Sequence, residues 1–251
     1  MNAKRGENPQ PRVPVCAIGA SAGGVNALKE FFRHIPDDLG LAFVVIIHLR
    51  PDHPSSLSEI LAGHTRMPVE QVSDAPALEP NRVYVIAPDS ELVIDESNIT
   101  SRPFSDPRGK RAPIDMFFRS VAHARGDGLA VILSGAGSDG AIGVRAIKEA
   151  GGVIFVQEPK DAEYAMMPRS ALSAGVADFV APIPRLVERI VEVVRSKEAV
   201  RSLPTNEAEQ IVQRIVAFLR ARTGHDFSSY KRATVLRRIK RRMQVDRKSV
   251  V

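Results

Sequence analysis

Residues 15–24 read VCAIGASAGG, a short apolar run that ends in a turn of small residues with Ser21 at its centre. Such a run is typical of a buried strand of a parallel sheet. The small residues let the chain turn sharply, and the first amides of a following helix are free to stabilise an oxyanion. The stretch therefore predicts a strand–turn–helix unit with Ser21 as a candidate nucleophile, although a serine in such a turn also serves as a helix cap or a phosphate ligand.

Two further apolar runs end on residues of complementary chemistry. AFVVII (42–47) ends at His48, and LAVIL (129–133) continues through a glycine-rich segment to Asp139. The carboxyl ends of parallel strands lie along one edge of a sheet, so Ser21, His48 and Asp139 are expected to meet there. His48 would act as general base and Asp139 would orient it. The alternatives are a histidine satisfied in the core and an aspartate that caps a helix beginning near Ala141.

The order of the apolar runs indicates the fold class. From Val15 to about Val194 they alternate with amphipathic stretches, which predicts an α/β fold with a doubly wound, mainly parallel sheet. Residues 83–102 alternate in polarity, which predicts an antiparallel β-hairpin excursion. The expected strands are 14–19, 42–48, 83–87, 129–134, 153–157 and 178–180. The expected helices begin near Gly24, Ser55, Pro113, Gly140, Pro168 and Pro184.

Composition sets the class of protein. With 251 residues and 44% hydrophobic content, the chain can bury a substantial core. No apolar run approaches the roughly 20 residues that a bilayer span requires, and residues 1–12 lack an apolar signal core, so we expect a soluble, cytoplasmic protein without membrane insertion. The single cysteine, Cys16, lies inside an apolar run and is expected to be a buried, unreactive residue.

The charge is concentrated near the end of the chain. Residues 231–248 hold nine basic side chains and one acidic side chain, a net charge of +8 against +6 for the whole sequence. We expect a main domain over 13–195, an exposed linker over 196–206, and a short helical appendage over 207–251 that is the start of a further domain. Its arginines suit a solvated helix face or an acidic partner helix; stacking aromatics are sparse, so nucleic-acid binding is not expected.

Two other site classes fit parts of the sequence. Gly135-x-Gly137-x-x-Gly140 follows a strand, and Glu158 ends the next strand about 20 residues later, the spacing of a dinucleotide-binding fingerprint. That alternative leaves Ser21 and His48 unexplained. A metal site could combine four residues, but no HExxH or paired cysteines support it, and neither a metal nor a cofactor is expected. Those four residues are His48, Asp52, His53 and His64.

Several ordered motifs resemble the catalytic domain of the CheB family, the chemotaxis protein-glutamate methylesterases, from about Val13 to Val194. The motifs are IGASAGG (18–24), VVIIHL (44–49), APIDMFFRSVA (112–122), LSGAGSDGAIG (133–143) and EYAMMPRSAL (163–172). The resemblance implies a doubly wound sheet with a β-hairpin and a catalytic triad. The implied triad is Ser21, His48 and Asp139.

The same resemblance implies a reaction and a partner. It implies hydrolysis of methyl esters on receptor glutamates, and deamidation of receptor glutamines, with methyl-accepting chemotaxis receptors as partners. Two positions depart from the family's common pattern: Ala22 stands where threonine is frequent, and Ala136 where methionine is frequent. These departures bear on the support of the histidine or the oxyanion, and so on the rate more than on the reaction class.

The tail resembles the start of the CheR methyltransferase, as found in fused CheB–CheR proteins, over about 211–245. The stretch that carries this likeness is FLRARTGHDFSSYKRATVLRRIKRRMQV (218–245). No methyl-donor-binding domain follows, so transferase activity is not expected of this chain. A catalytically idle docking module within a signalling hybrid is the competing functional class.

Overall fold

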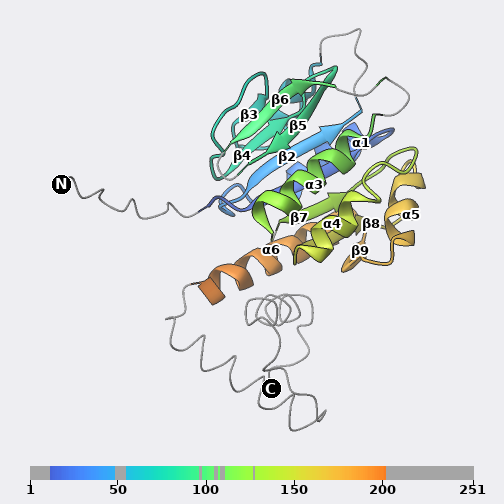
Figure 1. The fold of residues 1–251 in the computed structure, drawn as a ribbon. Helices are drawn as coiled ribbons and strands as arrows, with labels where there is room; N and C mark the ends of the chain where they lie inside the picture. Colours follow the sequence, from blue (N-terminus) through green and yellow to red (C-terminus); the bar gives the residue numbers. More distant parts are fainter. Residues whose placement is uncertain are drawn as a thin grey trace, which may run out of the picture.

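A seven-stranded, entirely parallel sheet forms the centre of the structure (Figure 1). The structure is a computed structural model that describes residues 12–48, 55–95, 98–104, 107, 111–126 and 128–201. The strand order is β3-β4-β2-β1-β7-β8-β9. The strands are β1 (Val15–Ala20), β2 (Ala42–Ile47), β3 (Val69–Gln71), β4 (Arg82–Val85), β7 (Leu129–Ile132), β8 (Val153–Gln157) and β9 (Phe179–Ala181).

The chain winds outward from β1 in two directions, which confirms the predicted doubly wound α/β fold. After β1 it builds β2, β3 and β4 on one side, and it then returns to build β7, β8 and β9 on the other. The winding direction therefore reverses between β1 and β7, which is where open α/β sheets bind ligands, beyond the carboxyl ends of the strands.

Six helices of the described residues cover this sheet (Figure 1). One group packs α1 against α2 and α6, another packs α3 against α4, and α5 packs on β7 and β8. Five of the six begin within two residues of the predicted positions, and α4 begins three residues late because Asp139–Ile142 first form turns. The helices are α1 (Gly24–His34), α2 (Leu57–Ala62), α3 (Pro113–Arg125), α4 (Gly143–Glu149), α5 (Met166–Ser173) and α6 (Ile183–Arg201).

The β-hairpin is real but begins later than its sequence pattern suggested. Strands β5 (Ser90–Ile94) and β6 (Ile99–Pro103) pair antiparallel in a separate two-stranded sheet that packs on α3. The first part of the alternating stretch instead forms β4, which pairs in parallel with β2. The short strand β3 was not predicted, because its sequence Val-Glu-Gln is polar and partly exposed at the sheet edge.

Helix α6 runs past the boundary expected for the main domain. It extends to Arg201, into the residues expected to form a linker. Lys197 and Glu198 are good helix formers, and the first proline that interrupts the pattern is Pro204. The expected appendage over 207–251 lies outside the described residues.

The core lies on both faces of the central strands. Every residue of β1 and β2 is buried, as expected for strands covered by helices on two sides. Phe31 and Phe32 of α1 pack edge-to-face with each other and with Phe43 of β2, at centroid distances of 5.4 to 6.4 Å. Cys16 is fully buried, as predicted, and burial raises the pKa of its thiol. No helix among the described residues is long and apolar enough to cross a bilayer.

Candidate active site

The structure brings the three predicted side chains together at the carboxyl edge of the sheet. Ser21 follows β1, His48 follows β2, and Asp139 lies in the segment after β7. The Ser21 Oγ lies 3.2 Å from Nδ1 of His48, and Nε2 of His48 lies 2.9 Å from Oδ2 of Asp139. The imidazole therefore bridges a hydroxyl and a carboxylate that are far apart in sequence.

The partners of His48 determine which ring nitrogen carries the proton in the neutral imidazole. An ionised carboxylate only accepts hydrogen bonds, so Nε2 donates to Asp139 and Nδ1 is left as the acceptor for the Ser21 hydroxyl. The His48 side chain is 38% exposed, whereas that of Asp139 is 8% exposed. A substrate can thus approach the histidine while the carboxylate behind it stays shielded from water.

Asp139 is fixed by main-chain amides as well as by the histidine. Its Oδ2 accepts the Ile114 amide at 3.0 Å, and its Oδ1 accepts the Asp115 amide at 2.9 Å. Both amides belong to the first turn of α3, whose dipole favours a negative charge there. One alternative from the sequence is that Asp139 caps the helix near Ala141. The carboxylate instead caps α3, whose Ile114 lies 25 residues earlier in the chain.

Asp115, whose amide binds Asp139, uses its own carboxylate to cap the next helix. The sequence patterns assigned it no role. Its Oδ1 accepts the amide of Gly143, the first residue of α4, at 2.6 Å. The side chain is buried, and this burial raises the pKa of Asp115, with the Gly143 amide acting against the rise and the nearby Asp139 charge adding to it. A carboxylate two residues after a helix-starting proline signals a capping role only at its own helix, so no local pattern points to this bond with α4.

The nucleophile turn has a defined geometry. The Gly24 amide donates to the Ser21 carbonyl at 2.8 Å, and Gly23 has φ 69° and ψ −4°. Ala22 is not among the described residues with positive φ, so residues 21–24 form a type II turn. A Cβ on Gly23 would also lie 2.7 Å from the Ser134 Oγ, which leaves room only for glycine.

The first glycine of the segment after β7, Gly135, packs closely against protein. The Gly135 amide donates to the Tyr164 carbonyl, and the Met167 amide donates to the Gly135 carbonyl. A Cβ on Gly135 would meet Sδ of Met167 at 2.2 Å and Cβ of Ser21 at 3.0 Å. Gly135, the first glycine of the dinucleotide pattern, is therefore enclosed by Met167 and Ser21, whereas a Cβ on Gly137, the second glycine, would meet no atom within 4 Å.

The metal alternative finds no support in the described residues. They contain no group of three or more His, Cys, Asp or Glu side chains that could hold an ion. His48 faces Ser21 and Asp139, and His64 accepts a hydrogen bond from Nε of Arg33 at 3.3 Å. Asp52 and His53 lie outside the described residues.

Exposed apolar side chains border the candidate active site, and sequence reasoning did not single them out. Ile142 is 65% exposed and follows Asp139 by three residues. Tyr164 and Met166 are 47% and 61% exposed in the segment that pairs with Gly135 next to Ser21.

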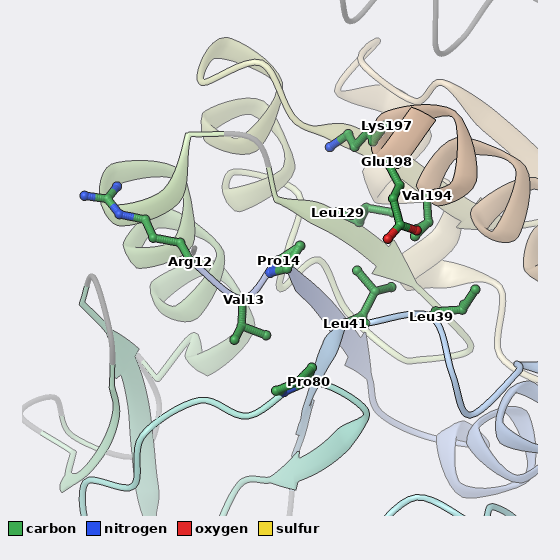
Figure 2. Close-up of a pocket in the computed structure, with 11 residues that line it drawn as sticks. Arg12, Val13, Pro14, Leu39, Leu41, Pro80, Leu129, Val194, Lys197 and Glu198 are labelled. Carbon is green, nitrogen blue, oxygen red and sulfur yellow. The ribbon is translucent and has the colours of Figure 1, made fainter. Parts of the chain in front are cut away.

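A pocket of about 470 Å³ lies at the opposite edge of the sheet. Figure 2 shows that Pro14, Leu41 and Leu129, which stand at the starts of β1, β2 and β7, line it together with Lys197 and Glu198 of α6. Because the strands begin here and end at Ser21 and His48, this pocket takes no part in the candidate active site.

Comparison with known proteins places this arrangement in a family. The profile of the family described as CheB methylesterase matches residues 16–190. The chain belongs to the CheB methylesterase family. A second profile, the all-alpha domain of CheR methyltransferase, matches residues 211–248. The CheB match contains every residue of the candidate active site, and the CheR match falls on the tail that resembled it in sequence.

The names of two relatives agree with the CheB assignment, and a third similar protein has no named activity. A putative protein-glutamate methylesterase/protein-glutamine glutaminase of Leptospira interrogans is 33% identical over 178 residues, which is 70% of this chain and 92% of the relative. A protein-glutamate methylesterase/protein-glutamine glutaminase 2 of Burkholderia pseudomallei is 31% identical over 186 residues, and the match spans 54% of its length. An uncharacterised 104.1 kDa protein of Rhodobacter capsulatus is 36% identical over 214 residues, only 22% of its length.

A solved structure shares the fold of the CheB domain. The crystal structure of the Thermotoga maritima CheB methylesterase catalytic domain superimposes with a TM-score of 0.66 at 26% identity. The match covers 72% of this chain and 98% of that domain. The doubly wound sheet with its hairpin is therefore the architecture of a CheB catalytic domain.

Proposed function

We propose that this chain is a serine hydrolase that removes methyl esters from glutamyl side chains of chemotaxis receptors and deamidates glutaminyl side chains. The observation that carries the proposal is the hydrogen-bonded series from Ser21 through His48 to Asp139. The CheB family assignment and the names of the relatives support the substrate class.

Each residue of the series has a defined step in this reaction. As Ser21 Oγ attacks the side-chain carbonyl carbon, its proton passes to Nδ1 of His48, and Asp139 stabilises the imidazolium that forms. The tetrahedral oxyanion then collapses, the bond to the leaving group breaks, and His48 returns the proton to methanol or ammonia. A water molecule, deprotonated by the same base, then attacks the acyl-enzyme. This step frees Ser21 and leaves a glutamyl carboxylate on the receptor.

The oxyanion requires hydrogen-bond donors beside Ser21, and the nucleophile turn supplies them. Within the described residues, the main-chain amides of Ala22 and Gly23 have no protein acceptor. They stand at the N-terminus of α1, where the helix dipole favours negative charge. Donors fixed in advance at this point stabilise the tetrahedral intermediate without reorganisation.

The decisive experiment measures methanol release from methylated receptor fragments. Ser21→Ala is expected to lower the rate by at least about 10³-fold, because no other group replaces the attacking oxygen. Ser173→Ala is the matched control, since that exposed serine donates only to the Arg169 carbonyl of its own helix. An unchanged rate in Ser21→Ala would reject the hydrolase and favour a docking module that retains the fold.

A further inference from the structure

Ser134 is a buried polar residue directly behind the nucleophile turn. It follows the apolar end of β7 and is only 1% exposed. Its carbonyl accepts the Ser21 amide at 3.0 Å, and its Oγ lies 2.9 Å from the Ala22 carbonyl oxygen. One residue therefore contacts the main chain both before and after the Ser21 side chain.

The hydrogen bonds of Ser134 fix the direction of its hydroxyl proton. The Tyr164 amide donates to Oγ at 3.0 Å, and a carbonyl oxygen such as that of Ala22 can only accept. The hydroxyl must therefore donate to Ala22. The Ser134 amide in turn donates to Oε1 of Gln157 at 2.8 Å, and Nε2 of Gln157 donates to Oδ2 of Asp161 at 2.8 Å. This series leaves Ser134 no alternative arrangement.

The donated hydrogen bond selects one of two turn geometries. Type I and type II turns differ mainly in the orientation of the central peptide, here the one that joins Ala22 to Gly23. In the observed type II turn, the Ala22 carbonyl points toward the buried Ser134 hydroxyl. The peptide is trans, so the Gly23 amide points the opposite way from the Ala22 carbonyl and from Ser134, and among the described residues it has no protein acceptor.

We propose that Ser134 is a positioning residue that keeps the Gly23 amide directed at the oxyanion of the reaction. This inference rests on the proposed hydrolase function. Without the hydroxyl, the peptide is free to rotate to the type I orientation, which turns the Ala22 carbonyl oxygen outward. A carbonyl dipole at that point opposes the negative charge that forms during attack, whereas the amide stabilises it.

The test compares Ser134→Ala with Ser134→Thr on two substrates, methylated receptor fragments and p-nitrophenyl acetate. Ser134→Ala is expected to lower kcat by about 10- to 10²-fold with KM unchanged, because the amide acts on the transition state and not on bound substrate. Ser134→Thr keeps a hydroxyl and is expected to restore most of kcat. Ser173→Ala again serves as the serine-to-alanine control.

The outcomes separate positioning from mere structural support. A wild-type kcat in Ser134→Ala would overturn the inference. Equal losses in the Ala and Thr variants, in parallel with lower thermal stability, would show packing alone and would also overturn it. If the Ala variant does not fold, Ser134→Cys replaces it, and its weak S–H donor is expected to give an intermediate kcat.

A readout without turnover distinguishes this inference from the proposed function. A crystal structure of Ser134→Ala shows the orientation of the Ala22–Gly23 peptide directly. The inference expects a type I or mixed turn there, and a fully retained type II turn would contradict it. A wild-type protein that hydrolyses neither ester would instead reject the hydrolase function, whatever the orientation of the peptide.

Discussion

Asp139 and Asp115 cap two neighbouring helices in series. The carboxylate of Asp139 accepts the amide of Asp115 at 2.9 Å, and the carboxylate of Asp115 accepts the amide of Gly143 at 2.6 Å. The first bond joins the segment after β7 to the start of α3, and the second joins α3 to the start of α4. The position of the carboxylate behind His48 is thus tied to the packing of α3 against α4.

Asp139→Asn is expected to lower kcat by about 10²- to 10⁴-fold. All three groups around this carboxylate are donors: Nε2 of His48 and the amides of Ile114 and Asp115. An asparagine must turn its own NH₂ group toward one of them, so one donor is left unsatisfied. The same mismatch is expected to reduce the free energy of unfolding by about 1–3 kcal/mol.

Steady-state hydrolysis and urea unfolding measure the two effects of Asp139→Asn. Asp37→Asn, an exposed carboxylate in the loop before β2, is the matched control and is expected to change neither quantity. Full activity in Asp139→Asn would contradict a role for this carboxylate in orienting His48.

Asp115→Asn is expected to change how stability depends on pH. Burial raises the pKa of Asp115 above its ordinary value of 3.8 in the folded protein. The folded state then binds this proton more tightly than the unfolded state, so the contribution of Asp115 is largest at acid pH. It declines as the pH rises from 3.8 through the raised pKa, and above that it is constant.

Thermal and urea unfolding between acid and neutral pH test whether the contribution of Asp115 to stability falls as the pH rises. The free energy of unfolding of the wild type minus that of Asp115→Asn is expected to decrease as the pH rises through this window. The asparagine carbonyl still accepts the Gly143 amide, so the helix cap survives the substitution. A difference that increases with pH would mean that the amides around Asp115 outweigh its burial.

Gly135→Ala is expected to displace the nucleophile. The added Cβ would lie 2.2 Å from Sδ of the buried Met167 and 3.0 Å from Cβ of Ser21. Overpacking of this kind costs about 1–3 kcal/mol of stability, and a shift of a reacting group by about 1 Å costs about 10²-fold in rate. The Ala variant should therefore fold with a lower melting temperature and hydrolyse esters slowly.

Gly63→Ala is the control for this substitution. Gly63 has φ −73°, and a Cβ there meets only the Ile60 carbonyl at 3.4 Å. The Gly63→Ala variant should therefore keep nearly the same melting temperature and rate of hydrolysis as the wild type. If Gly135→Ala kept wild-type activity, the close packing of Met167 beside Ser21 would have no part in positioning the nucleophile.

The sequence was most informative where the position of a residue depends on a single strand. The runs that end at Ser21 and His48 are continuous and apolar, as strands buried on both faces must be, and the ends of such strands locate the site. Strand β3 gave no such signal, because three residues at a sheet edge carry little apolar pattern.

Hydrogen bonds between residues far apart in the chain could not be predicted from a single sequence. Asp139 accepts the amide of Ile114, 25 residues earlier in the chain, and Ser134 donates to a carbonyl 112 residues away. A local pattern indicates only the nearest helix, so the capping alternative for Asp139 named the helix near Ala141 instead of α3, and Ser134 was given no role. The fold brings Ser134 to Ala22 through the parallel pairing of β1 with β7.

Covalent labelling with a fluorophosphonate tests most directly that Ser21 is a nucleophile activated by His48 and Asp139. The reagent loses fluoride to an activated serine and leaves a phosphonyl adduct that mass spectrometry locates. We expect the adduct on the peptide that contains Ser21, and labelling slowed by at least about 10²-fold in His48→Ala. An adduct on another serine, or equal labelling rates in the two proteins, would contradict the account.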